Sequence, residues 1–426
     1  MQDDACAFAA SNRERLLADL AESGGLLLRG FSLRTALEYE QVLQALNLHL
    51  VADYVPGDAR RHHKSEHVFT AADTPRQHLI APHHEMAYTR TRPGIISFFC
   101  VRPGGSLAGP TPIFRTAKLM DELEPRLVER LRKPLKHERL YNPQVGAELT
   151  MFGRFSSWLI DALVYVFRLP VLPASHFAAW PQAFGTSDTA EVEARCAQQQ
   201  IKLQWVRGSA GAHAWLKFHI PPIVRHPRTR EERLTFSTSQ FSSADFPVNH
   251  MCADRLFGGS ALSRLNVGAR RARPRVHSAV RAYLRAGVPA RPSARDFATR
   301  YSDGDRQNFR RVSGVRIAAI NSHSLWRVLW SRAQTDCDGV PFSAADSRQI
   351  IEARVLARTE LAGHAGRTLT FRRRAQATWR HAVVFHWRAG DVLILDNVDV
   401  MHARMPSYSP PGERVILTAL ANPYTI

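Results

Sequence analysis

The stretch PHHEMAY at residues 82–88 places a histidine two positions before a glutamate, His83 and Glu85. It is the one place where a histidine precedes an acidic residue by two, although the chain has 19 histidines. In a strand, residues i and i+2 point to the same side, so we expect these two side chains to converge on one ion. His84 would then face away from that ion.

A second stretch, LDNVDVMHARMP at residues 395–406, supplies a lone downstream histidine, His402. Two histidines and one carboxylate on one face of an ion leave the opposite positions open, which is the arrangement of non-haem Fe(II) oxygenases. The pattern therefore predicts an iron site made by His83, Glu85 and His402. It also requires a closed or double-sheet β architecture, because local structure cannot bring His402 back to the early pair. Taken alone, each histidine could instead be a hydrogen-bonded structural residue.

Apolar runs predict strands on both sides of His402. The segment WRAGDVLILDN at residues 387–397 indicates a turn followed by a buried strand, and ERVILTALA at residues 413–421 indicates a second strand after a Pro-Pro-Gly turn. We expect His402 to lie in the connection between them. Arg414 opens the second strand, where its guanidinium could grip a carboxylate with two parallel hydrogen bonds. This placement indicates a dicarboxylate co-substrate.

Further motifs are spread over much of the chain. They are GGLLLRGF (24–31), PHHEMAYTRTRPGIISFFCVRP (82–103), AGPTPI (108–113), WPQAFGTSD (180–188), CDGVPF (337–342) and the block at 387–414. With these motifs the chain resembles the taurine-dioxygenase-like (TauD/TfdA) family of Fe(II)/2-oxoglutarate dioxygenases, most closely its branch that hydroxylates amino acids during antibiotic biosynthesis. The resemblance implies that His83, Glu85 and His402 hold Fe(II), and that Thr111 and Arg414 bind 2-oxoglutarate.

The resemblance also implies a fold and a reaction. The fold would be α+β, mainly β with flanking helices, built on a double-stranded β-helix (jelly-roll) core with a large helical or loop insertion. The reaction would hydroxylate an unactivated C–H bond with 2-oxoglutarate and O2 as co-substrates and release succinate and CO2. The substrate would be a small molecule, an amino acid either free or attached to a carrier protein, or else a small organic acid. Arg404 could bind its acid group, or could be an ion-paired residue at a strand end.

The chain departs from the family around its threonine. Relatives have Gly-Gly-Glu-Thr-Pro-Ile-x-Asp where this chain has AGPTPIFR at residues 108–115, so Thr111 is kept while two acidic positions are lost. This departure keeps an alternative open, a degenerate, non-catalytic jelly-roll protein that acts as a basic interaction module.

The net charge of +19 and the pI near 10.5 raise the question of a nucleic-acid partner. Lysine is rare, however, so arginine supplies most of the 57 basic residues, a bias typical of a GC-rich genome. Arginine is densest at residues 269–316, where no ladder of stacking aromatic residues accompanies it. We therefore do not expect nucleic-acid binding.

A chain of 426 residues can bury one large core with insertions or two modest cores. The resemblance implies a single dioxygenase domain over residues 1–426, with an Arg-rich insertion at 257–334 where the chain fits the family least well. Apolar segments stay well short of the roughly 20 residues that cross a membrane, and the first residues are acidic where a signal peptide is basic. We therefore expect a cytoplasmic protein without a membrane partner. The five cysteines contain no C-x-x-C pair, which argues against a disulfide framework or a zinc site. The oligomeric state is left open.

Periodicity and turn residues also predict the secondary structure that flanks these motifs. We expect helices at residues 11–21, 35–50, 118–131 and 191–200, the last capped by Asp188, and strands at residues 26–29, 95–101, 203–207 and 236–241.

Overall fold

The computed structural model describes residues 4–55, 61–71, 76, 80–105, 108–116, 119–123, 125–144, 178–208, 211–235, 383, 387–405, 407, 409–410 and 412–426. The chain divides into two compact units, the first made of Met1–Glu124, Pro222–Thr238 and Ala353–Ile426, and the second of Pro125–Pro221 and Ser239–Glu352. The predicted insertion at 257–334 and the predicted strand at 236–241 lie outside the described residues.

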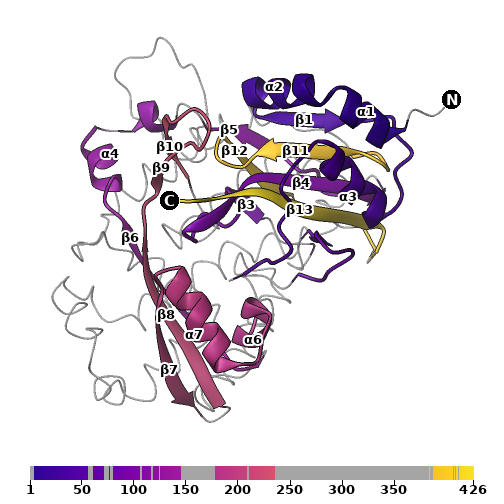
Figure 1. Ribbon diagram of the computed structural model, residues 1–426. Helices are drawn as coiled ribbons and strands as arrows, with labels where there is room; N and C mark the ends of the chain where they lie inside the picture. Colours follow the sequence, from indigo (N-terminus) through magenta and orange to yellow (C-terminus); the bar gives the residue numbers. More distant parts are fainter. Residues whose placement is uncertain are drawn as a thin grey trace, which may run out of the picture. The chain divides into compact units, whose positions relative to one another are not determined.

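A five-stranded antiparallel sheet forms the centre of the first unit (Figure 1). Its strands in spatial order are β1 (Gly25–Leu28), β11 (Val392–Asp396), β4 (Thr91–Pro103), β13 (Arg414–Thr425) and β2 (Val68–Thr70). The predicted strands at 26–29, 95–101 and 413–421 are confirmed, as is the turn and strand predicted within 387–397, and β4 and β13 extend beyond the predicted ranges. The prediction of a mainly β fold with some helices is confirmed as well.

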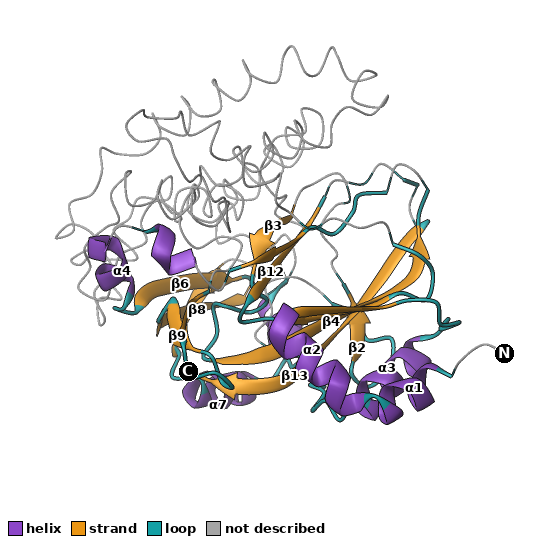
Figure 2. Ribbon diagram, turned by 90° about the horizontal axis from the view of Figure 1, so that it is seen from above, coloured by secondary structure: helices purple, strands orange, loops and turns teal. Residues whose placement is uncertain are grey.

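The two faces of this sheet carry different apolar clusters because successive side chains of a strand alternate between faces. One face packs against helices α1 (Ala5–Ser11), α2 (Arg13–Ser23) and α3 (Ala36–Ala45), as Figure 2 shows. This helix-side cluster includes Leu16, Leu20, Tyr39, Val42, Leu43, Ile95, Phe99, Val392, Ile394, Leu417 and Ala419. The site-side cluster on the other face includes Met86, Tyr88, Ile96, Phe98, Cys100, Trp387, Leu393, Leu395, Val400, Ile416 and Leu420.

The N-terminal helices begin and end where local chemistry dictates. Thr35 caps α3 through a capping box with Glu38, which satisfies backbone N–H groups that the first turn leaves without partners. The predicted helix at 35–50 ends early, at Ala45, and Asn47 then adopts a positive φ of 59° that turns the chain. Gly24, with φ 79°, ends α2 in the left-handed conformation that glycine adopts without strain.

A smaller sheet in the same unit consists of β3 (Ile80–His83), β12 (Val400–Arg404) and β5 (Ile113–Arg115), in that order. A hairpin of β9 (Ile223–Arg225) and β10 (Glu232–Leu234) and the short 3-10 helix η1 (Leu119–Glu122) complete the described part. Side chains join the hairpin to the turn between β11 and β12: Arg233 donates to Asp399 at 2.5 Å, and His226 Nε2 lies 3.0 Å from Asp396 Oδ2.

The glycine before β11 is required by its surroundings. Gly390 has φ 87°, and a Cβ atom there would meet the carbonyl oxygen of Phe31 at 2.5 Å. Next to it, Asp391 accepts two hydrogen bonds from the guanidinium of Arg29, at 2.9 and 2.7 Å. This turn therefore fixes how the segment after β1 joins the start of β11.

The second unit contains a three-stranded antiparallel sheet of β6 (Leu135–Tyr141), β8 (Gly211–Ile220) and β7 (Lys202–Gly208), in that order. Among the residues of this unit that the structure describes, the helices are α4 (Pro125–Leu131), α6 (Trp180–Phe184) and α7 (Thr189–Gln198). Asp188 caps α7 as predicted, through the backbone N–H of Ala190. The single helix predicted at 118–131 is instead η1 and α4, because Pro125 lacks the N–H group that would continue the first helix. In the parts of the chain that the structure describes, each helix is too short or too polar to cross a lipid bilayer.

The helix-side cluster gives a test of the fold. Replacing Leu43, which is fully buried on α3, with alanine should lower the free energy of unfolding by about 2–5 kcal/mol, because it leaves a cavity between the helix and the sheet. The matched control is Leu37→Ala on the same helix, where the side chain is 59% exposed and the change should stay within about 0.5 kcal/mol. Urea denaturation followed by circular dichroism measures both. Equal losses for the two variants would contradict the assigned packing of α3.

Candidate metal and co-substrate site

The register of the smaller sheet brings the two predicted histidine ligands together. His402 on β12 pairs directly with His83, the last residue of β3, and their ring centroids are 4.3 Å apart. Phe98 of β4 packs its ring edgewise on His402 at 5.0 Å, so the larger sheet supports the same imidazole. The expectation that His402 lies in a connection is wrong, because Val400–Arg404 pairs with strands on both sides.

Glu85 lies in a turn and approaches the histidines from there. The prediction that it converges with His83 because both lie on one strand is therefore wrong. Strand β3 ends at His83, and Met86 adopts a positive φ of 53° in the turn that follows. The side-chain amide of Asn397 holds this turn, because its oxygen accepts from the Glu85 N–H at 2.7 Å and its nitrogen donates to the Glu85 carbonyl at 3.0 Å. His84 faces away, as predicted, with Nε2 3.2 Å from the hydroxyl of Thr116.

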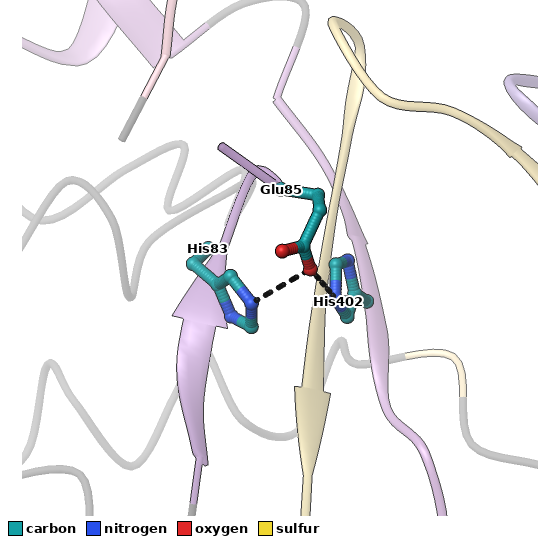
Figure 3. Close-up of side chains that lie close together, drawn as sticks. All are labelled: His83, Glu85 and His402. Carbon is teal, nitrogen blue, oxygen red and sulfur yellow. Dashed lines mark ion pairs between the residues drawn. The ribbon is translucent and has the colours of Figure 1, made fainter. Parts of the chain in front are cut away.

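The three side chains present one atom each to a common point (Figure 3). Oε2 of Glu85 lies 3.7 Å from Nε2 of His83 and 3.7 Å from Nε2 of His402. These separations are too long for hydrogen bonds. Ligand atoms each about 2.1 Å from a shared ion lie roughly 3–4 Å apart, so the spacing fits a divalent transition-metal ion. Two imidazoles and one carboxylate are the donor set that suits Fe(II) with open positions.

The environment of Glu85 keeps it ionised. Burial alone would raise the pKa of this carboxyl, but the Arg61 guanidinium and the two imidazoles outweigh burial and hold the pKa well below its usual range. Oε1 of Glu85 accepts from the Tyr54 hydroxyl at 2.6 Å and from Nη2 of Arg61 at 3.2 Å. Burial and the Glu85 charge raise the pKa of Tyr54, so the phenol keeps its proton and donates. The carboxylate is therefore available as an anionic ligand.

His402 is suited to bind a metal ion as a neutral imidazole. Burial, followed by the nearby His83, lowers the pKa of His402 to about 4 against the opposing effect of Glu85. At neutral pH the ring therefore carries no extra proton that an ion would have to displace. Its Nδ1 is buried and has no hydrogen-bond partner among the described residues.

The two predicted co-substrate residues contact each other. Nη2 of Arg414 donates to the Thr111 hydroxyl oxygen at 3.2 Å, and Nε1 of Trp387 donates to the same oxygen at 3.1 Å. A hydroxyl has two acceptor lone pairs and one hydrogen. With both lone pairs engaged, the remaining O–H of Thr111 is left to donate, as a carboxylate oxygen requires. Arg414 and Thr111 thus form a donor pair for an anion.

Arg404 lies close to this pair. Burial lowers the pKa of Arg414 to about 10, and burial together with the positive charge of Arg414 lowers the pKa of Arg404 to about 9. On β12, Arg404 lies two residues from His402, and the pairing of β12 with β3 is irregular between them. Two guanidiniums that repel each other would be stabilised by an anionic group bound nearby.

Comparison with known proteins identifies the family. The model of the family described as "Taurine catabolism dioxygenase TauD, TfdA family" matches residues 3–240 and 369–420, which is more than half of the chain. The chain belongs to the TauD/TfdA family. The predicted family is thereby confirmed.

Individual known proteins also match this member of the TauD/TfdA family, over part of their length. A clavaminate synthase-like protein of Arabidopsis thaliana is 25% identical over 51% of this chain and 58% of its own. The dapdiamide synthesis protein DdaC of Enterobacter agglomerans is 24% identical over 50% of this chain and 54% of its own. This chain thus spans a little over half the length of these two relatives. The crystal structure of PvcB from Pseudomonas aeruginosa is 12% identical, covers 96% of this chain and 79% of its own, and gives a TM-score of 0.38.

Two other groups of side chains within the described ranges could in principle hold an ion. In the first, Nδ1 of His67 lies 2.6 Å from Oε1 of the buried Glu40, with Glu66 nearby. The second group is His226 with Asp396 and Asp399. Its two carboxylates already contact His226 and Arg233 of the β9–β10 hairpin.

Four residues of this site in the TauD/TfdA-family chain had no role predicted from sequence: Tyr54, Arg61, Trp387 and Asn397. Trp387 and Asn397 lie at the two ends of the motif at residues 387–397. Their position, flanking an apolar strand, was the sequence feature that could have identified them as site residues. Tyr54 and Arg61 lie in a polar stretch without a recognisable pattern. Each donates a hydrogen bond to Glu85, which lies 31 residues after Tyr54 and 24 residues after Arg61 in the sequence.

Asn397→Asp tests the support of Glu85. The substitution keeps the oxygen that accepts from the Glu85 N–H. It replaces the amide nitrogen, which donates to the carbonyls of Glu85 and Pro93, with a carboxylate oxygen that cannot donate. The free energy of unfolding should fall by about 2 kcal/mol or more, because two buried carbonyls lose their donor. Urea denaturation measures the change.

A matched control is Asn422→Asp. The Asn422 side chain only accepts, from the His49 N–H at 2.9 Å, and aspartate can still accept there. Its effect should stay within about 0.5 kcal/mol. If Asn397→Asp were as mild as the control, Asn397 would not hold the turn.

Proposed function

We propose that the chain is an Fe(II)- and 2-oxoglutarate-dependent dioxygenase that hydroxylates an unactivated C–H bond of an amino acid or a small organic acid and releases succinate and CO2. One observation carries the proposal. Nε2 of His83 and of His402 each lie 3.7 Å from Oε2 of Glu85, in the same unit as the donor pair of Thr111 and Arg414. Candidate ligands for a metal ion and candidate donors for an anion in one unit support the proposal.

Each residue has a separate task in this proposal. His83, Glu85 and His402 would hold Fe(II), and the bound ion supplies the activation of O2 that protein side chains lack. Arg414 and Thr111 would fix the far carboxylate of 2-oxoglutarate, with Trp387 holding the Thr111 hydroxyl in its donating orientation. The contribution of the protein is orientation and the exclusion of water by the site-side cluster.

For the substrate we propose an acid bound by Arg404. Its place on β12 two residues from His402 and near Arg414, together with its charge, supports recognition of a carboxylate. The resemblance to the amino-acid-hydroxylating branch supports an amino acid, free or attached to a carrier protein.

The finer features of the fold stay proposals as well. The five-stranded sheet and the smaller sheet of β3, β12 and β5, with the site-side cluster between them, support a double-stranded β-helix (jelly-roll) core. A single domain over residues 1–426 with an insertion at 257–334, and a cytoplasmic location, remain predictions from the sequence.

The degenerate, non-catalytic alternative is not favoured. It arose from the acidic residues lost around Thr111, but the Thr111 hydroxyl keeps two donors on its oxygen and therefore a hydrogen to donate. A chain that had lost co-substrate binding would have no need of this arrangement beside a buried carboxylate and two imidazoles.

The proposal is tested by anaerobic spectroscopy. Adding Fe(II) and 2-oxoglutarate to the full chain should produce visible absorption, because 2-oxoglutarate that chelates Fe(II) through two oxygen atoms absorbs visible light. His402→Ala should remain colourless under the same conditions. Succinate release with a panel of amino acids then identifies the substrate. A colourless wild-type protein would contradict the proposed function.

Arg414→Gln tests the co-substrate site separately. Removing a buried cation that pairs with a carboxylate should weaken 2-oxoglutarate binding by about 30-fold or more, measured by titrating the visible absorption of the Fe(II)-loaded protein. Arg102→Gln is the control, because this arginine is exposed on β4 opposite Val415 and should leave the affinity unchanged. Equal affinities for the two variants would exclude Arg414 from the site.

A further inference from the structure

The two oxygens of the Glu85 carboxylate are used differently. Oε1 accepts hydrogen bonds from Tyr54 at 2.6 Å and from Arg61 at 3.2 Å, whereas Oε2 faces the imidazoles of His83 and His402 at 3.7 Å (Figure 3). The donors thus approach one oxygen only. Nothing in the chemistry of a carboxylate requires this division, since a free carboxylate binds an ion through one oxygen or through both.

The contacts around Tyr54 and Arg61 fix both donors in place. The Arg61 guanidinium lies over the Tyr54 ring, 4.4 Å from its centroid. Its Nη1 also donates to the carbonyl oxygens of Thr70, at 3.1 Å, and Ala71. The side chains of Arg61 and Glu85 are only 8% and 5% exposed. The guanidinium therefore ties the end of β2 to Oε1 and holds the phenol against the same atom.

We propose that Tyr54, supported by Arg61, is a positioning residue that keeps Glu85 a one-oxygen ligand of the metal ion. This inference rests on the proposed function. The co-substrates would need open positions on an ion held by His83, Glu85 and His402. A second oxygen from Glu85 would compete with them for such a position. Occupying Oε1 with two hydrogen bonds prevents this.

The backbone of Glu85 is held independently of its carboxylate. The Asn397 amide fixes the N–H and the carbonyl of Glu85, so removal of the Tyr54 hydroxyl leaves the residue in place and frees only the end of the side chain. Tyr54→Phe is consequently a local change. It removes one oxygen atom and keeps the ring beneath Arg61.

The experiment uses Mn(II), which binds the same donor set without oxidising in air. The affinity of the full chain for Mn(II) is measured by calorimetry, and the infrared difference spectrum of loaded minus metal-free protein isolates the bound carboxylate. A carboxylate bound through one oxygen has a wider separation of its antisymmetric and symmetric stretches than one bound through two. Wild type should show the wide separation. Tyr54→Phe should narrow it and weaken Mn(II) binding by about 10-fold or more.

Controls separate this inference from the proposed function. Tyr39→Phe removes another buried phenol, one that stacks on Phe99 in the helix-side cluster, and should change neither readout. If wild type failed to bind Mn(II), or His402→Ala bound it equally well, the proposed function itself would fail. If wild type binds Mn(II) but already shows the narrow separation, or if Tyr54→Phe keeps the wide one whatever its affinity, only the positioning inference is overturned.

Arg61→Lys gives a second, independent variant. Lysine keeps the positive charge, but its single ammonium group cannot contact Glu85 and the carbonyls of Thr70 and Ala71 as the guanidinium does. Like Tyr54→Phe, Arg61→Lys should narrow the separation between the antisymmetric and symmetric carboxylate stretches. A spectrum identical to wild type would remove Arg61 from the proposal.

Discussion

The site depends on the antiparallel register between β3 and β12. His83 pairs with His402, and this pairing alone puts two imidazoles from distant parts of the sequence on one side of a sheet. A slip of one residue would move either histidine to the opposite face, because side chains alternate along a strand. The larger sheet resists such a slip, since Phe98 packs against His402 and the site-side cluster fills the space between the sheets. The helix-side cluster secures the other face of that sheet.

Charge divides the site into two ends. At one end a buried carboxylate is balanced by Arg61 and aimed at the imidazoles of His83 and His402, and these groups together attract a divalent cation. At the other end are Arg414 and Arg404, which together attract anions. Burial lowers the pKa of both, and the charge of Arg414 lowers the pKa of Arg404 further. Burial is costly for each of these groups in isolation. A bound cation and a bound dicarboxylate would relieve both costs, so the arrangement favours binding the two together.

Features that follow from apolar runs and short motifs could be predicted from the sequence. The long apolar strands β4, β11 and β13 were evident from their runs of residues, and the motif around His83 and the later His402 identified the residues that meet in space. Local periodicity misled at Glu85, which lies in a turn with a left-handed Met86 and not on a strand. Tyr54 and Arg61 could not be found, because a hydrogen bond to a distant carboxylate leaves no trace in the residues around the donor. The pairing of Thr111 with Trp387 was hidden for the same reason.

The register is measured most directly by a disulfide bond. Directly paired residues of antiparallel strands have Cα atoms about 4.5–5.5 Å apart, within the range that a disulfide accepts. In the double variant His83→Cys with His402→Cys, mild oxidation should join residues 83 and 402, as identified by peptide mapping with mass spectrometry. The double variant His84→Cys with His402→Cys should not cross-link, because residue 84 faces Thr116. A bond between 84 and 402, or none between 83 and 402, would contradict the account.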